Sequence, residues 1–319
     1  MHSVSISLAG ITKKQVDRAS SAPLPTGTIC LFASYAPDGD LPVHTRFYLK
    51  NLLTCGVILH VILSGADTIH ESTQRFCNDL GIHVWKRPNG GLDFGAWQFL
   101  LQKGLAEGAP YILFANDSVF GPLAPLPPLL KTLSANQRPA WGLVASRAVT
   151  PHLQSWFVGL SQAAFQSAPV QHVLKLPFED MSRDEIIWHG ELGLSVALKA
   201  ADIPLHAAWS DLNTPVARFF PANPMHTHWR DIVQTKAVPF LKQELLRDNP
   251  FRVPHLKDWR ALISAESGFD PDWIETYLGQ HPPRPLTCHP TWKGRALYSI
   301  MNRLDRLQWQ KDRRRGAAR

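Results

Sequence analysis

The chain has 319 residues, of which 45% are hydrophobic, 18% are charged and 10% are aromatic, which is the composition of a globular protein and excludes a disordered chain. The formal net charge is +7, and residues 293–319 carry all of it, with nine Lys or Arg against two Asp. The rest of the chain is balanced at 24 charges of each sign, which argues against a nucleic-acid partner because such proteins spread basic charge over the folded body.

Targeting and redox signals are weak in this sequence. The first residues lack the charged-then-apolar pattern of a signal peptide, and no apolar run reaches the length of about 18 residues that a membrane-spanning helix needs. We therefore expect a cytoplasmic protein without a transmembrane span. The cysteines lie far apart and form no CxxC pair, so we predict free, buried thiols in a reducing compartment. They are Cys30, Cys55, Cys77 and Cys288.

Apolar runs alternate with helix-like segments through the first half of the chain, after a polar leader at residues 1–26. The runs predict buried strands over residues 28–35, 56–65, 82–89, 111–117 and 141–146. The segments between them predict helices over residues 41–55, 68–81 and 93–108. Alternation of this kind indicates an open, mostly parallel α/β sheet, which binds its ligands at the carboxyl ends of its strands.

The second half of the chain looks mostly helical. Helices are predicted over residues 153–167, 183–202 and around 239–248. We divide the chain into a leader (1–26), an α/β half that binds a nucleotide sugar (27–150), a mostly helical acceptor-side half of the same domain (151–265) and a C-terminal extension (266–319).

The C-terminal extension is predicted to end in a basic amphipathic helix. One helical face carries Leu297, Ile300, Met301, Leu304 and Leu307, with Arg and Lys around them. Three interpretations stay open: a solvated helix end, a helix that lies on an anionic membrane surface, and a nucleic-acid contact. The membrane interpretation would place the protein peripherally on the inner face of the membrane.

The predicted strand at 111–117 runs into three polar residues, Asn116-Asp117-Ser118, directly before a Gly-Pro turn. This pattern resembles the GT-A type of nucleotide-sugar glycosyltransferase, in which a short acidic motif ends a central strand. Asp117 is thus a candidate diphosphate or metal ligand, with Mg²⁺ or Mn²⁺ as the cofactor. A fully acidic motif has two carboxylates and this one has one, which leaves metal dependence open. A plain turn-forming role for these residues is the alternative.

Four sequence blocks extend the resemblance to a specific family. They are RPNGGLDFGAW (87–97), YILFANDSVFGPLAPL (111–126), HLQSWFVGLSQAAFQS (152–167) with GELGLSVAL (190–198), and NPMHTHWRDIVQTKAVPFLKQELLRDNP (223–250). Together they resemble the rhamnan synthesis protein F family of polysaccharide-assembly proteins. The resemblance implies a GT-A-like, Rossmann-like α/β fold with a helical C-terminal elaboration. It also implies a glycosyltransferase that moves a sugar, such as rhamnose or another deoxyhexose, to a cell-surface polysaccharide or lipopolysaccharide.

Several residues around this motif are candidates for the donor site. Gly90 allows close approach of the backbone to a ligand. Asp93 heads the following helix, where it could cap the helix or bond the base or ribose of a nucleotide sugar. The donor-binding candidates are Asn89, Gly90, Asp93, Asn116 and Ser118.

Glu191 is the candidate general base that would take the proton from the acceptor hydroxyl during inverting transfer. Asp184 and Glu185 compete for that role, and a solvated helix face is the alternative for all three. Lys242 and Arg247 are candidate phosphate-binding cations, although a local ion-pair network with Glu244 would explain them equally well.

The acceptor side is assigned to the block that starts at residue 152. His152 and Gln154 could bond sugar hydroxyls, and Trp156 could stack on a sugar ring, with a core position as its alternative. His226 and His228 do not predict a zinc site, because no Cys or paired carboxylate stands beside them. A second class of function also fits the chain: a non-catalytic component of an assembly complex that binds a glycan or a nucleotide sugar.

Overall fold

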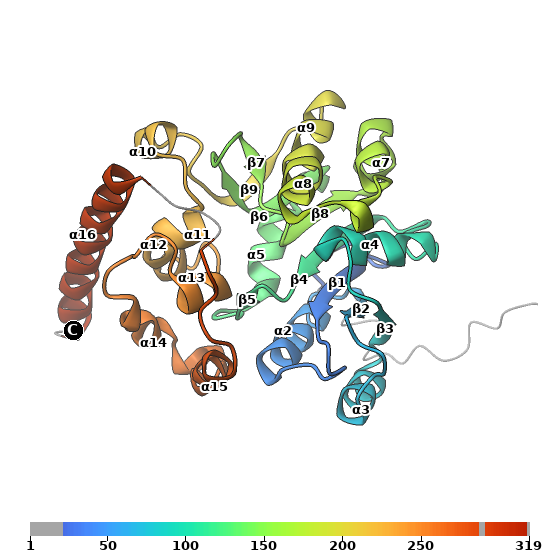
Figure 1. Cartoon of the computed structure of the whole chain (residues 1–319), viewed down its shortest axis with the longest axis horizontal. Coiled ribbons are helices and arrows are strands. Elements are labelled where there is room, and N and C mark those ends of the chain that lie inside the picture. Colours follow the sequence, from blue (N-terminus) through green and yellow to red (C-terminus); the bar gives the residue numbers. More distant parts are fainter. Residues whose placement is uncertain (1–21, 287–290, 318–319) are drawn as a thin grey trace, which may run out of the picture.

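The computed structural model describes residues 22–286 and 291–317, with side chains described to residue 311. Its centre is one sheet in the order β3-β2-β1-β4-β8-β6-β7, and β9 pairs with β6 at the far end (Figure 1). The sheet strands are β1 (Ile29–Tyr35), β2 (Ile58–Ser64), β3 (His83–Arg87), β4 (Tyr111–Asn116), β6 (Ala140–Ser146), β7 (His152–Leu153), β8 (Phe157–Ser161) and β9 (His206–Ser210).

Six of these strands run in one direction. β1, β2, β3 and β4 are paired in parallel, and β8 is antiparallel to both β4 and β6, so β6 and its parallel neighbour β9 run the same way as β4. Their carboxyl ends therefore share one edge of the sheet. The expected α/β class with an open, mostly parallel sheet is confirmed.

Helices cover both faces of the sheet. One face packs against α2 (Val43–Leu53), α3 (Glu71–Leu80) and α5 (Leu126–Leu133), which supply Tyr48, Cys77 and Leu130 to the core. The other face packs against α4 (Leu92–Gln102), α7 (Ala168–Leu174) and α9 (Gly193–Ala200), which supply Trp97, Val170 and Leu198. The three layers give each central strand two apolar faces, which explains why these strands read as continuous apolar runs.

The segment 153–167 was predicted as a helix, and this prediction is wrong over its first part. Residues 157–161 form strand β8, which lies between β4 and β6, and only α6 (Gln162–Gln166) is helical. An apolar run this short fits a buried strand and a buried helix equally well. Here it forms a strand because it pairs with β4 and β6 in the sheet.

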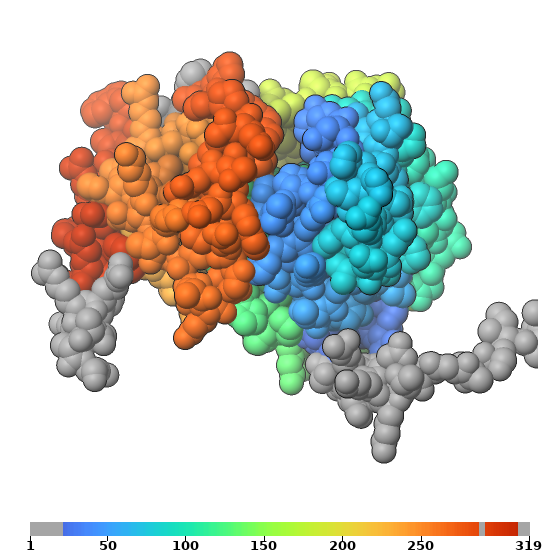
Figure 2. All heavy atoms as spheres, turned by 90° about the horizontal axis from the view of Figure 1, so that it is seen from below, coloured from blue at the N-terminus to red at the C-terminus, as the bar shows by residue number. Residues whose placement is uncertain are grey.

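The chain beyond β9 provides the predicted helical elaboration. Its helices are α10 (Pro215–Phe219), α11 (Pro224–Thr227), α12 (Trp229–Gln234), α13 (Gln243–Asp248), α14 (Trp259–Leu262), α15 (Asp272–Gln280) and α16 (Trp292–Ala317). They enclose a third apolar cluster that includes Trp229, Leu245, Ile274 and Tyr298. α15 also packs against α2. The ring of Phe47 in α2 lies 5.4 Å from that of Trp273 in α15 and 5.6 Å from that of Phe269, which precedes α15. Figure 2 shows the orange segment against the blue one.

Three of the four cysteines are buried and free, as predicted, and Cys288 lies outside the described residues, as does most of the predicted leader. Within the described ranges, no helix has both the length and the apolar character needed to cross a bilayer.

Candidate functional site

Asp117 lies at the point where the strand order of the sheet reverses. The chain passes from β1 to β2 and β3 on one side, whereas β4 joins β1 on the other side. The Asp117 backbone N–H donates to the carbonyl oxygen of Ala33 (3.2 Å), and its Oδ2 accepts from Ser34 Oγ (2.6 Å) and from the Tyr35 N–H (3.1 Å). Open α/β sheets bind their ligands at such a switch point.

Asn116 joins this strand end to the first turn of α4. Its side-chain amide donates to Asp93 Oδ2, while its Oδ1 accepts from the N–H (3.1 Å) and the hydroxyl (2.6 Å) of Ser118. Asp93 does not bond the α4 backbone as an N-cap; that position belongs to Gly91 in the left-handed region (φ 62°). The fold thus brings a second carboxylate to a motif whose own sequence has only one.

The two aspartates share a partly buried, anionic environment. Burial raises the pKa of Asp117 to about 7 against the hydrogen bond from Ser34, and the charge of Asp93 raises it as well. Burial also raises the pKa of Asp93 to about 6, although Lys242 and Asn116 act in the opposite direction. A group that brings positive charge would relieve this repulsion.

Lys242 reaches the site from the C-terminal half of the chain. A two-stranded ribbon pairs β10 (Leu241–Lys242) with β5 (Val119–Phe120), directly after the polar motif. Lys242 Nζ donates to Ser118 Oγ (2.8 Å). Burial lowers the lysine pKa, and the carboxylates of Glu191, Glu244 and Asp93 oppose that effect. Lys242 is therefore a cation that faces the acidic cluster from a fixed strand position.

Glu191 lies in a π-helical turn, η3 (Ile187–Leu192), between α8 (Arg183–Ile186) and α9. Segments of this kind are frequent at functional sites. Glu191 Oε2 accepts from the N–H (2.9 Å) and hydroxyl (2.6 Å) of Ser155, and Oε1 lies 3.5 Å from His152 Nε2. Burial opposes its ionisation, but the bonds from His152 and Ser155 prevail and lower the pKa to about 2. Ser155 directly precedes Trp156, whose carbonyl oxygen accepts from the Asn116 N–H (3.2 Å), so Glu191 is held beside the end of β4. From there its charge acts on Asp93 and on Lys242.

The three residues assigned to the acceptor side are almost wholly buried. His152 is 3% exposed and bonds the Thr150 carbonyl (2.7 Å) besides facing Glu191. Gln154 bonds Asn223 (2.8 Å) and accepts from the Trp156 indole (3.0 Å). Trp156 fills the core, as its alternative interpretation had it. Because all three side chains are buried, they pack beneath the surface of the site and do not present a sugar-binding face.

Three other candidates make no side-chain hydrogen bond to the acidic cluster within the part of the chain that the structure describes. Arg247 makes a bidentate pair with Asp248 (2.9 and 2.7 Å), and both side chains are buried, so this guanidinium is committed to a local ion pair, with Asp248 in place of the Glu244 that its alternative named. Asn89 is exposed in the turn before α4 and makes no hydrogen bond within the described part of the chain, while Gly90 packs beside Arg87 and Glu179.

Three residues of the site were missed by the sequence analysis. Ser34 holds Asp117, Ser155 holds Glu191, and Gln243 donates to the Asp117 carbonyl oxygen (2.5 Å). Ser34 had a usable signal, because it ends a predicted strand as Asn116 does. Nothing local marks Ser155 or Gln243, since both depend on contacts between distant segments.

The acidic cluster provides some, but not all, of the ligands that a divalent cation needs. Among the described residues, no group of three or more His, Cys, Asp and Glu is arranged to hold a metal ion. Asp93 and Asp117 provide two carboxylates, and Mg²⁺ is commonly bound by one or two carboxylates together with substrate phosphates. The pair therefore fits a metal that arrives with a nucleotide.

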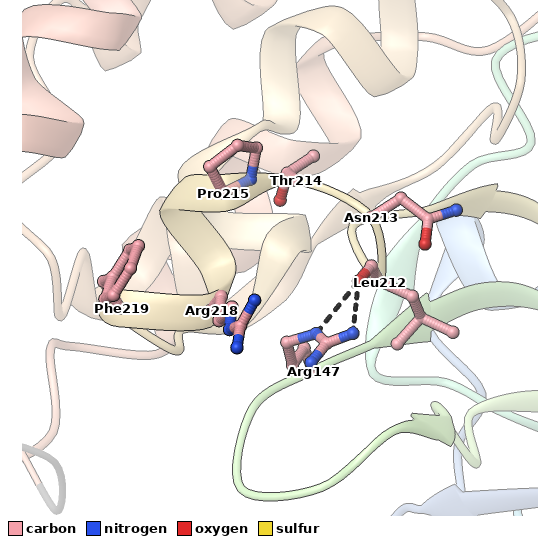
Figure 3. A pocket seen from close by; sticks show the side chains of 7 residues that line it. All are labelled: Arg147, Leu212, Asn213, Thr214, Pro215, Arg218 and Phe219. Carbon is pink, nitrogen blue, oxygen red and sulfur yellow. Dashed lines mark hydrogen bonds between the residues drawn. The ribbon is translucent and has the colours of Figure 1, made fainter.

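A surface pocket of about 300 Å³ lies further along the same edge, where β6 and β9 end (Figure 3). The Arg147 guanidinium donates to the Leu212 carbonyl oxygen (2.9 and 2.5 Å). Arg218 of α10 is exposed and lies on the side of the pocket next to Arg147. The other lining residues are Asn213, Thr214, Pro215 and Phe219. The Arg147 guanidinium is held by the Leu212 carbonyl oxygen and the Thr214 hydroxyl donates to the Asp211 carbonyl oxygen (2.8 Å), so of the two arginines and the threonine Arg218 is the one exposed to solvent.

The sheet order and the acidic cluster at its switch point define the class as an α/β protein with a candidate ligand site at the carboxyl edge of its sheet. The sequence model of the family described as rhamnan synthesis protein F matches residues 61–250, more than half of the chain. The protein belongs to this family, which confirms the resemblance. The match spans the strand-end motif, η3 and the β10 lysine.

Individual relatives are more distant. The virulence protein VirA of Vibrio anguillarum is 27% identical in an alignment 280 residues long, which covers 78% of this chain and 89% of that protein. A structure described as a nucleotide-diphospho-sugar transferase from Desulfovibrio desulfuricans G20 matches with a TM-score of 0.35 at 15% identity, over 60% of this chain and 91% of that one. A cytidylyltransferase from Leptospira borgpetersenii serovar Hardjo-bovis matches with a TM-score of 0.35 at 9% identity, over 57% and 75%.

Proposed function

We propose that the protein is a glycosyltransferase that moves a sugar from a nucleotide-sugar donor to a growing cell-surface polysaccharide or lipopolysaccharide. The observation that supports this most directly is the grouping of Asp93, Asp117 and Lys242 around the end of β4 at the switch point of the sheet, with Glu191 held beside them by Ser155. Family membership supports the substrate class, with rhamnose or another deoxyhexose as the first sugars to test.

The donor diphosphate would lie against the end of β4. Lys242 would pair with phosphate oxygens, since a fixed ammonium binds phosphate as a point charge. Asp93 and Asp117 would hold Mg²⁺ or Mn²⁺, which supplies positive charge against the departing diphosphate. Ser34 and Asn116 would keep the two carboxylates in place.

Transfer would be a single displacement with inversion. The acceptor hydroxyl oxygen bonds to the anomeric carbon as the bond to the diphosphate oxygen breaks, and the hydroxyl proton passes to Glu191. A pKa of about 2 makes Glu191 a weak base at rest. An acceptor hydroxyl that displaced the Ser155 hydroxyl would remove one of the bonds that lower this pKa, and Glu191 would then become more basic.

Calorimetric titration with dTDP, UDP and GDP, with and without Mg²⁺ or Mn²⁺, tests the donor site. We expect one nucleotide to bind selectively, and Asp117→Asn or Asp93→Asn to weaken its metal-dependent binding at least tenfold, because each removes a charged ligand. Asp184→Asn is the matched control, since Asp184 is an exposed carboxylate on the nearby α8. Folded protein that binds none of the nucleotides would refute the donor site.

Turnover separates the enzyme from a non-catalytic component that binds a glycan or a nucleotide sugar. With the nucleotide sugar identified by titration, we expect Glu191→Gln to leave binding of the nucleotide within about twofold. Release of nucleoside diphosphate in the presence of acceptor should fall by roughly 10²–10⁴-fold, the range for loss of a general base. Binding without turnover in the unaltered protein would favour the non-catalytic component.

A further inference from the structure

The C-terminal helix α16 buries polar side chains and exposes apolar ones. Ile300, Leu304 and Leu307 are 56%, 59% and 53% exposed, and Trp292 at the start of the helix is 70% exposed. At about 100° per residue the three aliphatic side chains lie within about 60° of one another around the helix. We call these three residues the α16 stripe.

The opposite face of α16 fixes the helix to the protein through hydrogen bonds and charges. Asn302 is 1% exposed and donates to the Thr227 carbonyl oxygen (2.9 Å), and the Tyr298 hydroxyl donates to the Phe220 carbonyl oxygen (2.5 Å). Arg306 pairs with Asp258 (2.7 Å), which also pairs with the wholly buried Arg230 (3.0 Å). The helix is thus oriented by polar contacts, and the stripe faces solvent.

Cations accompany the stripe. Lys293 and Lys311 lie in line with it near the two ends of its exposed face, and Arg303 lies on its flank; all three are exposed. Residues 293–319 carry a net charge of +7, whereas the charges of the remaining residues balance at 24 of each sign. Figure 1 shows α16 along one border of the molecule, on the far side of α12 and α14 from the sheet.

We propose that this face of α16 docks on the surface of an anionic lipid bilayer. A helix with aliphatic side chains toward the acyl region and Lys or Arg beside them is the form that lies in the membrane interface. The positive charge complements anionic headgroups, and a single exposed helix offers a convex edge rather than a groove for a peptide. Nucleic acid is a poorer match, because phosphates and bases give aliphatic side chains nothing to bury against.

Co-sedimentation of the full chain with vesicles tests this directly. We expect binding to phosphatidylglycerol–phosphatidylcholine vesicles at least tenfold tighter than to phosphatidylcholine alone, and weaker with added salt. The double substitution Leu304→Asn and Leu307→Asn should weaken binding at least tenfold, as should Arg303→Gln with Lys311→Gln. Val196→Asn is the control, because Val196 on α9 is equally exposed (54%) and should leave binding unchanged.

The outcomes distinguish membrane docking through the α16 stripe from self-association of the chain through it. All substituted positions are exposed, so thermal unfolding should stay within a few degrees of the unaltered protein. Absence of binding to anionic vesicles, or binding that the stripe substitutions leave intact, would overturn the proposal. A dimer in light scattering that becomes a monomer in the Leu304→Asn, Leu307→Asn protein would assign the stripe to self-association instead.

Discussion

The raised pKa of Asp117 carries a consequence for stability. Its folded-state pKa of about 7 lies above the value near 4 of an unfolded chain, so the folded state holds the proton more tightly between these values. Stability therefore falls as the pH rises through this window. The cost is fully present above about pH 7, where Asp117 carries the charge that the proposed nucleotide site would use.

Asp117→Asn should remove this cost while keeping an oxygen that accepts from Ser34 and Tyr35. We expect the substituted protein to unfold a few degrees higher than the unaltered protein at pH 8, and the difference to shrink at pH 5. Thermal unfolding followed by circular dichroism at both pH values measures it. A difference that is the same at pH 5 and pH 8 would show that Asp117 is not the titrating group.

Individual residues of the candidate site were predictable where they stand at the end of a predicted strand. Asn116, Asp117 and Ser118 follow an apolar run, and this pattern predicts polar side chains at the carboxyl edge of the sheet, where the structure has them. The bond between Asn116 and Asp93 could not be predicted, because 23 residues separate them and only the packing of α4 on β4 joins them. The same holds for Lys242, whose partner Ser118 lies 124 residues away.

At the scale of elements, η3 depends on a glycine to approach α4. A Cβ on Gly190 would lie 2.9 Å from the buried ring of Phe94. We expect Gly190→Ala to destabilise the protein by about 1–3 kcal/mol, the usual cost of overfilling a packed contact, and to displace the adjacent Glu191.

Urea unfolding and turnover measure the two effects of this substitution. Gly279→Ala is the matched control: Gly279 is an exposed helical glycine with no atom within 4 Å of its would-be Cβ. That change should be neutral or stabilising by up to about 1 kcal/mol. Equal destabilisation by both substitutions would contradict a specific contact between η3 and α4.

Strands and helices with long patterns were predictable, and short ones were not. The continuous apolar runs gave β1, β2, β4 and β6 because a strand covered on both faces has no polar alternation. Gly81 was read as the end of a helix, and it adopts the left-handed conformation (φ 67°) that favours glycine there. β8 was misread as a helix, since its five residues contain no period long enough to separate the two structures.

At the scale of the whole molecule, the two predicted halves share one sheet. β8 comes from beyond residue 150, yet it lies between β4 and β6, which come from before it. We expect a fragment of residues 27–150 to aggregate, because it would expose the unpaired edges of β4 and β6.

Expression of that fragment beside the full chain, followed by size-exclusion chromatography, provides the test. The full chain should elute as a discrete species and the fragment should be lost to aggregation. A monodisperse, folded fragment would show that the first half is a unit of its own, in which case the boundary at residue 150 would separate two folding units.

The buried contacts of Asn302, Tyr298 and Arg306 hold α16 without using its apolar stripe, so attachment to the protein and contact with lipid are governed by different residues. Substitutions along the α16 stripe can therefore change which lipid surface the protein binds without weakening the attachment of the helix to the protein. Related chains that work in envelopes of different lipid composition would then be expected to diverge along Ile300, Leu304 and Leu307 while they keep the polar anchors behind them.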